Sequence, residues 1–264
     1  MNLQTVLLAL SMAIASSVAN AALVATYQFQ NTLAADQSGI TALAAVDPLG
    51  LSGFQTATLY GQTRRVYHFS ENSPFAEQAG LSLDTTGLVT PNQYSLEIIF
   101  AFDSNASPNG YRRLVDTHER ATDNGLYAIP TNNLQISGFA PVRPVFNPSE
   151  FHHLVVTNIS GSNVVSIFLD GAPVITTTSN VLDISNAAHV LNFFLDDSFE
   201  YSSGQIGLVR LYDSVLGNSE VAAIALNPLP APVPLPTIMW LLGAAVGGLG
   251  LKSRRNNLGH SYPK

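Results

Sequence analysis

The chain has 264 residues, with 18 Asp and Glu against 11 Lys and Arg, and no cysteine. Without cysteine it can form neither disulfide bonds nor thiolate metal sites. Its net charge of −7 argues against a nucleic-acid partner, because the phosphates would repel the protein.

Residues 1–21 predict a signal peptide. An apolar run from Val6 to Ile14 is followed by small residues that end in Ala19-Asn20-Ala21, an A-x-A cleavage pattern. The run is too short to span a bilayer, which favours a cleaved leader over an anchor. A buried N-terminal helix is the alternative.

Residues 22–227 predict one all-β domain, a two-sheet antiparallel sandwich. Helical periodicity is nearly absent, and short apolar or alternating runs recur between Gly, Pro, Asn, Asp and Ser. Only 217–226 predicts a helix. Many short strands without an internal repeat are typical of a sandwich. The expected strands are 23–29, 94–102, 152–159, 164–171, 172–179, 189–197 and 204–214.

The C-terminal segments predict a membrane-directed tail. A Pro-rich linker at 228–237 precedes an apolar helix and basic cluster at 238–255, and a short tail at 256–264 follows. The uncharged run is near the lower length limit of a transmembrane helix, and the basic cluster favours the cytoplasmic side. Because this cluster lies behind the apolar run, residues 22–233 carry seven Arg, no Lys and eighteen acids.

This layout resembles the PEP-CTERM sorting signal of Gram-negative bacteria. Val233-Pro234-Leu235-Pro236 stands at the place of the signal's Pro motif, and Arg254 and Arg255 belong to the terminal basic cluster. The resemblance implies export, anchoring in the inner membrane and processing by an exosortase. It places the body on the outer surface or in the extracellular matrix. An ordinary C-terminal anchor is the alternative.

The body resembles laminin-G-like domains, which have the concanavalin A-like jelly-roll fold. Three segments carry the resemblance: "TYQFQNTLAADQSG" (26–39), "FHHLVVTNISGSNVVSIFLDGAPV" (151–174) and "GQIGLVRLYDSVLGNSEVAAI" (204–224). The resemblance implies a jelly roll and a carbohydrate, such as an exopolysaccharide, as the ligand.

The same resemblance implies a Ca²⁺ site between the opening loop and a late strand. Asp36 matches the opening position, whereas Gly207 and Leu208 stand where the family has acids. In their place we expect ligands from the preceding loop, because Ca²⁺ binds six to eight oxygens. These candidate ligands are Asp196, Asp197 and Glu200. The alternative is that these acids only shape turns.

The segment "RRLVDTHERATDNG" (112–125) has the highest charge density of the body. We expect Asp116, Arg120 and Asp123 there to contact a polar ligand, and a solvated, salt-bridged loop is the alternative. Five tyrosines could stack on sugars if they share one rim. They are Tyr60, Tyr67, Tyr111, Tyr127 and Tyr201.

Catalysis is not expected, because glycoside hydrolysis needs two carboxylates across a cleft. Glu97 is the only acid on its strand, and the adjacent Asp196 and Asp197 are expected to point to opposite faces. The sequence therefore predicts a secreted, non-catalytic binding module for carbohydrate. The alternatives are a purely structural surface protein and an atypical glycan hydrolase that depends on Glu97.

Overall fold

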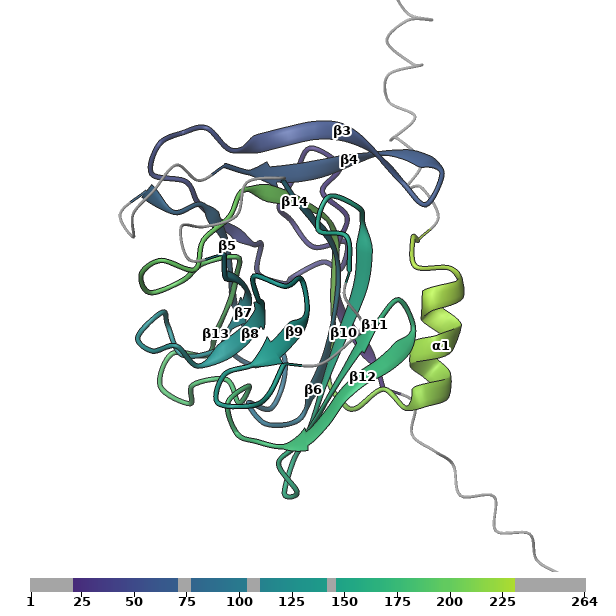
Figure 1. Cartoon of the computed structure of the whole chain (residues 1–264). Coiled ribbons are helices and arrows are strands. Elements are labelled where there is room, and N and C mark those ends of the chain that lie inside the picture. Colours follow the sequence, from purple (N-terminus) through teal and green to yellow (C-terminus); the bar gives the residue numbers. More distant parts are fainter. Residues whose placement is uncertain (1–20, 71–76, 104–109, 142–145, 231–264) are drawn as a thin grey trace, which may run out of the picture. The chain divides into compact units, whose positions relative to one another are not determined.

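The computed structural model describes residues 21–70, 77–103, 110–141 and 146–230 (Figure 1). A first compact unit ends at Pro228, and of the second unit only Leu229 and Pro230 are described. The expected signal peptide, sorting motif, apolar helix and basic cluster lie outside the described residues. Within the described ranges, no helix has the length and apolar character needed to cross a membrane.

The first unit is an all-β sandwich of two antiparallel sheets, as the sequence predicts. The larger sheet has the strand order β12-β11-β10-β6-β14-β4-β3, and β1 also pairs with β14. Its strands are β1 (Leu23–Tyr27), β3 (Gly53–Leu59), β4 (Gln62–Phe69), β6 (Tyr94–Phe102), β10 (His152–Ile159), β11 (Val164–Leu169), β12 (Ala172–Thr178) and β14 (Gly204–Tyr212).

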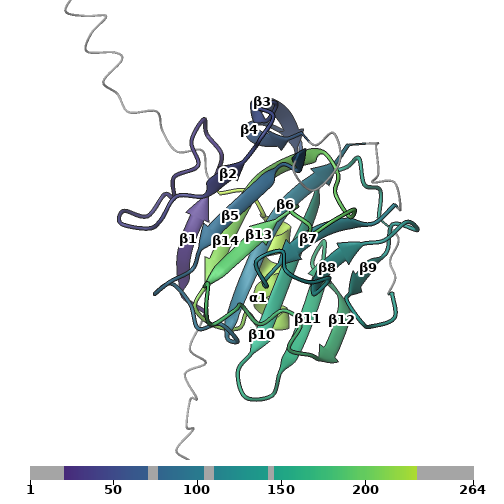
Figure 2. The same cartoon turned by 90° about the vertical axis from the view of Figure 1, so that its left-hand side faces the viewer.

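The smaller sheet has the order β2-β5-β13-β7-β8-β9 and faces the viewer in Figure 2. Its strands are β2 (Ala44–Val46), β5 (Gly80–Asp84), β7 (Arg112–Asp116), β8 (Gly125–Ala128), β9 (Leu134–Ile136) and β13 (Val190–Phe193). The strands at its two ends, β2 and β9, have three residues each.

Strand β14 is the most connected strand of the larger sheet. One of its edges pairs with β6 along nearly the whole strand. The other edge is shared, because β4 pairs with its first residues, Gly204–Ile206, and β1 with its last, Val209–Tyr212. A bulge at Gly207 separates the two stretches, and a Cβ at this position would overlap the side chain of Leu59.

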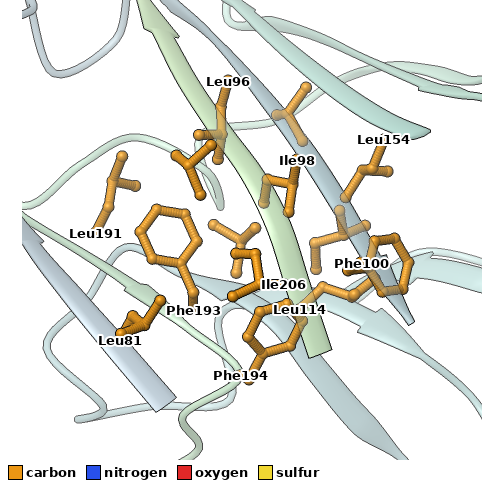
Figure 3. Close-up of a cluster of buried hydrophobic side chains, with 14 of the residues drawn as sticks. Leu81, Leu96, Ile98, Phe100, Leu114, Leu154, Leu191, Phe193, Phe194 and Ile206 are labelled. Atoms are coloured by element: carbon orange, nitrogen blue, oxygen red, sulfur yellow. The ribbon is translucent and has the colours of Figure 1, made fainter. Parts of the chain in front are cut away.

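The core lies between the two sheets and follows from the period-two alternation of the strands (Figure 3). In β6, Tyr94, Leu96 and Ile98 point into this core, as their spacing predicts. From the smaller sheet, Leu191 and Phe193 of β13 face them. Because these side chains have no exposed surface, their burial is the main source of stability for a domain without disulfides.

The one described helix, α1 (Asn218–Leu226), packs on the outer face of the larger sheet. Val221 of the helix joins Val155 and Phe168 of β10 and β11 in a second apolar cluster. The β11–β12 turn supports the same helix, because Gly171 lies against Ala225. Asp170 and Gly171 both have positive φ, which confirms the tight hairpin turn expected there.

We expect Phe193→Ala to lower the free energy of unfolding by about 4 kcal/mol, because it opens a cavity in the core. Chemical denaturation measures this change. Phe199→Ala is the matched control, because Phe199 is 58 % exposed and its truncation should cost less than about 0.5 kcal/mol. Equal losses in the two variants would contradict the assignment of the core.

Candidate functional site

The charged segment 112–125 begins as a strand and not as a solvated loop. Residues 112–116 form β7, and all five are buried. Leu114 and Val115 join the core, whereas Arg113 lies on the outer side. The alternative of a solvated loop therefore does not hold for residues 112–116, because the apolar pair Leu114 and Val115 anchors this part in the smaller sheet.

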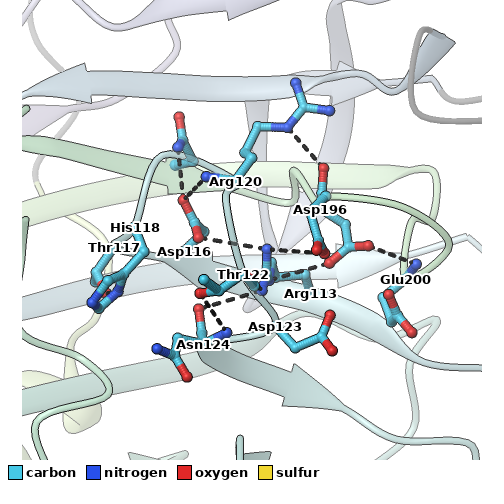
Figure 4. A network of polar contacts seen from close by, with 12 residues as sticks. Arg113, Asp116, Thr117, His118, Arg120, Thr122, Asp123, Asn124, Asp196 and Glu200 are labelled. Atoms are coloured by element: carbon cyan, nitrogen blue, oxygen red, sulfur yellow. Dashed lines mark hydrogen bonds and ion pairs between the residues drawn. The ribbon is translucent and has the colours of Figure 1, made fainter.

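Arg113 is the centre of a buried ionic network on the outer face of the smaller sheet (Figure 4). Its side chain has no exposed surface. Its Nε lies 3.3 Å from Asp196 Oδ1, and its Nη1 lies 3.5 Å from Asp116 Oδ1 and 3.8 Å from Asp197 Oδ1. One guanidinium thus faces three carboxylates, and its positive charge holds the acidic loop after β13 against β7.

The guanidinium also orders the loop that joins β7 to β8. Its Nη2 donates to the backbone carbonyls of Thr122 and Asn124. The Cζ atom lies 5.0 Å from the centroid of the Tyr127 ring, a cation–π contact. Gly125 leaves room for this arrangement, since a Cβ there would come within 3.1 Å of Arg113 Nε.

Asp196 shapes the second loop of the site, which follows β13. Its Oδ2 accepts hydrogen bonds from the backbone N–H groups of Ser198 (2.8 Å) and Glu200 (3.0 Å). Arg120 Nε donates to the Asp196 carbonyl at 2.8 Å and so links the two loops. Asp196 and Asp197 both approach Arg113, so the expectation that they point to opposite faces was wrong. They follow the end of β13, where strand alternation no longer applies.

A cleft of about 180 Å³ lies beside this network. Aromatic, acidic, amide and hydroxyl groups share its wall, so it offers both an apolar surface and hydrogen-bonding groups. The rings of Tyr111 and Tyr127 meet edge to face, with centroids 6.5 Å apart. The lining residues are Tyr111, Asp123, Tyr127, Gln135, Ser137, Gly138 and Glu200.

Three acids meet at this cleft. One carboxylate oxygen each of Asp123, Asp197 and Glu200 lie within 4.8 Å of one another. Burial raises the pKa of the Asp197 carboxyl, and the adjacent charge of Asp196 raises it further. For Asp196 burial acts in the same direction, but hydrogen bonds with Glu200 and Ser198 outweigh it, so this pKa lies below its usual range.

The structure separates the three residues expected to contact a ligand. Asp123 is exposed and lines the cleft. Asp116 is fully buried, where it accepts hydrogen bonds from Asn192 Nδ2 and the backbone N–H of Arg120. Arg120 is tied to Asp196. Asp116 and Arg120 therefore hold the loops in place, and only Asp123 faces the cleft.

The expected calcium ligands do not form one group. Asp197 and Glu200 come together with Asp123, but Asp36 is not in this group and instead accepts a hydrogen bond from Gln28 Nε2 at 2.6 Å. Gly207 stands where laminin-G-like domains, which the sequence resembles, have an acid. The Leu59 side chain fills the space that a side chain at this position would need. Three carboxylates have the right chemistry for Ca²⁺, but the one oxygen that each brings to this group gives three of the six to eight that the ion binds. Calcium stays a prediction.

Sequence reasoning missed three of the seven residues that line the cleft. Gln135, Ser137 and Gly138 belong to β9 and its following turn, and nothing marked them as a site. The alternation of Leu134 and Ile136 with Gln135 is the signal that could have placed the amide on the outer face. Of the five candidate tyrosines, only Tyr111 and Tyr127 line the cleft.

Glu97 lies far from this chemistry, on the outer face of the larger sheet. Its carboxylate has no exposed surface. It accepts hydrogen bonds from His153 Nε2 (3.0 Å), Arg210 Nη1 (3.1 Å) and Tyr212 Oη (2.7 Å). A substrate cannot reach a carboxylate that is buried and saturated in this way. Glu97 is a structural ion-pair partner, so the hydrolase alternative cannot depend on it.

We expect Glu97→Gln to lower the free energy of unfolding by about 3 kcal/mol at pH 7, because it leaves the Arg210 charge unpaired. Burial acts to raise the pKa of Glu97, but the His153 hydrogen bond and the Arg210 charge outweigh it and lower the pKa from 4.5. The stabilisation is therefore present above pH 4.5 and is lost as the pH falls through the lowered pKa.

Urea denaturation at pH 7 and at pH values below 4.5 measures this difference. The gap between the native protein and the Glu97→Gln variant should narrow in acid. Glu150→Gln is the control, because Glu150 is exposed and should change stability by less than about 0.5 kcal/mol. A gap that stays constant with pH would contradict the buried ion pair.

Comparison with known proteins finds the fold but no family. No family model matches the chain, and no curated protein matches it either. A solved structure with a similar fold is domain 4 of AbnA, a GH43 extracellular arabinanase from Geobacillus stearothermophilus, in complex with arabinotriose. It is 16 % identical, with a TM-score of 0.59, and the match covers 78 % of this chain and 99 % of that one.

Botulinum neurotoxins also share the fold. A structure of type C, whose cell entry depends on interaction with two ganglioside molecules, is 9 % identical with a TM-score of 0.56. The binding domain of type DC in complex with rat synaptotagmin II is 10 % identical with a TM-score of 0.55. These matches cover 79 % and 78 % of this chain, which spans about half of theirs, 51 % and 52 %. The similarity shows a jelly-roll-like sandwich.

Proposed function

We propose that the domain is a non-catalytic carbohydrate-binding module whose ligand occupies the cleft beside Arg113. The observation that carries the proposal is the mixed wall of this cleft. An aromatic ring such as that of Tyr111 can stack against the C–H face of a sugar. The carboxylates of Asp123 and Glu200 and the amide of Gln135 can hydrogen-bond its hydroxyl groups.

The fold comparison supports the same ligand class by analogy. The arabinanase domain was solved with arabinotriose, and the type C neurotoxin depends on gangliosides. Fold similarity does not by itself determine function, so the argument depends on the residues of the cleft. The laminin-G-like resemblance of the sequence agrees with this ligand class.

The proposal includes a cellular location for the domain. The sequence at both ends favours export, inner-membrane anchoring and processing by an exosortase, with the domain at the cell surface or in the matrix. These segments lie outside the described residues. A surface polysaccharide is the partner that fits this location. A purely structural surface protein is the alternative, and it would bind no glycan.

We expect Tyr111→Ala to weaken glycan binding about tenfold, or about 1.4 kcal/mol, because it removes the stacking ring. The test is a glycan array followed by calorimetry on the best neutral oligosaccharide. Tyr60→Ala is the matched control, because Tyr60 is 45 % exposed on the β3–β4 hairpin and outside the cleft. Absence of glycan binding, or equal loss in both variants, would overturn the proposal.

One observation favours a second candidate, glycan hydrolysis. Carboxylate oxygens within 4.8 Å at a cleft, with the pKa of Asp197 raised, resemble a pair for acid–base work. Two observations argue against hydrolysis. Asp197 Oδ1 lies 3.8 Å from Arg113 Nη1, and Asp197 is not among the residues that line the cleft. We expect no released sugar when bound oligosaccharides are incubated with the protein and analysed chromatographically. Release that Glu200→Gln abolishes would establish a hydrolase instead.

A further inference from the structure

We infer that the cleft selects uncharged glycans and rejects chains that carry carboxylate, sulfate or phosphate groups. This inference rests on the proposed function and names the ligand class of the same site. Three features carry it: the balance of charges around the cleft, the depth at which each sign of charge lies, and the exposure of Asp123.

The charges around the cleft do not balance. Arg113 and Arg120 are the cations that contact the two loops of the site, Arg113 with three carboxylates within 3.8 Å. Five acids contact Arg113 or meet at the cleft. They are Asp116, Asp123, Asp196, Asp197 and Glu200. Even with the raised pKa of Asp197, the acids outnumber the cations.

The two signs of charge also lie at different depths. Asp123 and Glu200 line the cleft, and Asp123 is exposed. The guanidinium of Arg113 is fully buried, packed at 5.0 Å from the Tyr127 ring centroid and surrounded by acids and backbone carbonyls. Among the described residues that line the cleft, a ligand therefore meets carboxylates and no cation. An anionic sugar would enter a negative potential without a partner for its charge.

A bound Ca²⁺ would reverse this selectivity, because the ion would become the largest local charge in the site. The geometry weighs against it. A divalent ion among the three acids would lie near the buried Arg113, which already contacts Asp197. An ion-free cleft would thus reject anionic glycans, whereas a calcium-loaded cleft would accept them.

Matched pairs of glycans test this inference on the full-length protein. The probes are cellohexaose, laminarihexaose and maltohexaose, each beside its form oxidised at C6 to a uronic acid, which keeps the ring and linkage and replaces the C6 hydroxyl with a carboxylate. We expect at least one neutral form to bind about tenfold more tightly than its oxidised partner at low salt. The difference should shrink at high salt, and chelator or added Ca²⁺ should not change the ranking.

Asp123→Asn tests which group sets the selectivity. We expect it to narrow the ratio of neutral to oxidised affinity several-fold, whatever it does to neutral binding. Glu220→Gln is the charge-matched control, because Glu220 lies on α1 across the sandwich. An equal effect of both variants would mean that only the overall charge of the domain matters, and would overturn the inference.

The outcomes separate the inference from the function on which it rests. No binding of any neutral glycan would remove the proposed function and the inference with it. Neutral and oxidised probes that bind equally, with Tyr111→Ala still weakening both, would keep the function and overturn the inference. Preferential binding of oxidised probes in Ca²⁺ alone would overturn the inference and establish a calcium site.

Discussion

The polar half of this domain depends on one buried guanidinium. Arg113 stands on the outer face of the smaller sheet, and both loops that enclose the cleft meet it. Removing a buried cation from three carboxylates is far more costly than breaking an exposed pair. The loop after β7 and the loop after β13 are therefore held to each other. The cleft is built on a rigid support, as a binding site with a fixed shape requires.

The sequence predicted six of the eight strands of the larger sheet, but it did not predict β3 and β4, although exposed residues recur along both. The alternation in 94–102 and the Asp-Gly turn at 170–171 located β6 and the β11–β12 hairpin correctly. Strand β7 was not predicted as a strand, because two arginines and an aspartate in five residues resemble a solvated loop. Strands β8 and β9 are too short for a periodic signal. Their strand character comes from pairing with neighbours.

The site was less accessible, because it is assembled by tertiary contacts between distant loops. The sequence marked Asp123 as a ligand candidate and Asp197 and Glu200 as metal candidates, but nothing local says that they meet. It included Asp36, whose side chain binds Gln28, and it left out Arg113. A residue that is buried by the pairing of two loops carries no signature in its own segment.

The position of β14 in the larger sheet has a consequence for the order of folding. This strand joins β1, β4 and β6, yet it is the last strand in the part of the chain that the structure describes. During synthesis, the first two hundred residues leave the ribosome without the strand that connects them. Contacts of such high sequence separation form slowly and late. The larger sheet can therefore be completed only after β14 has been translated, so most of its strands wait for a partner that is made last.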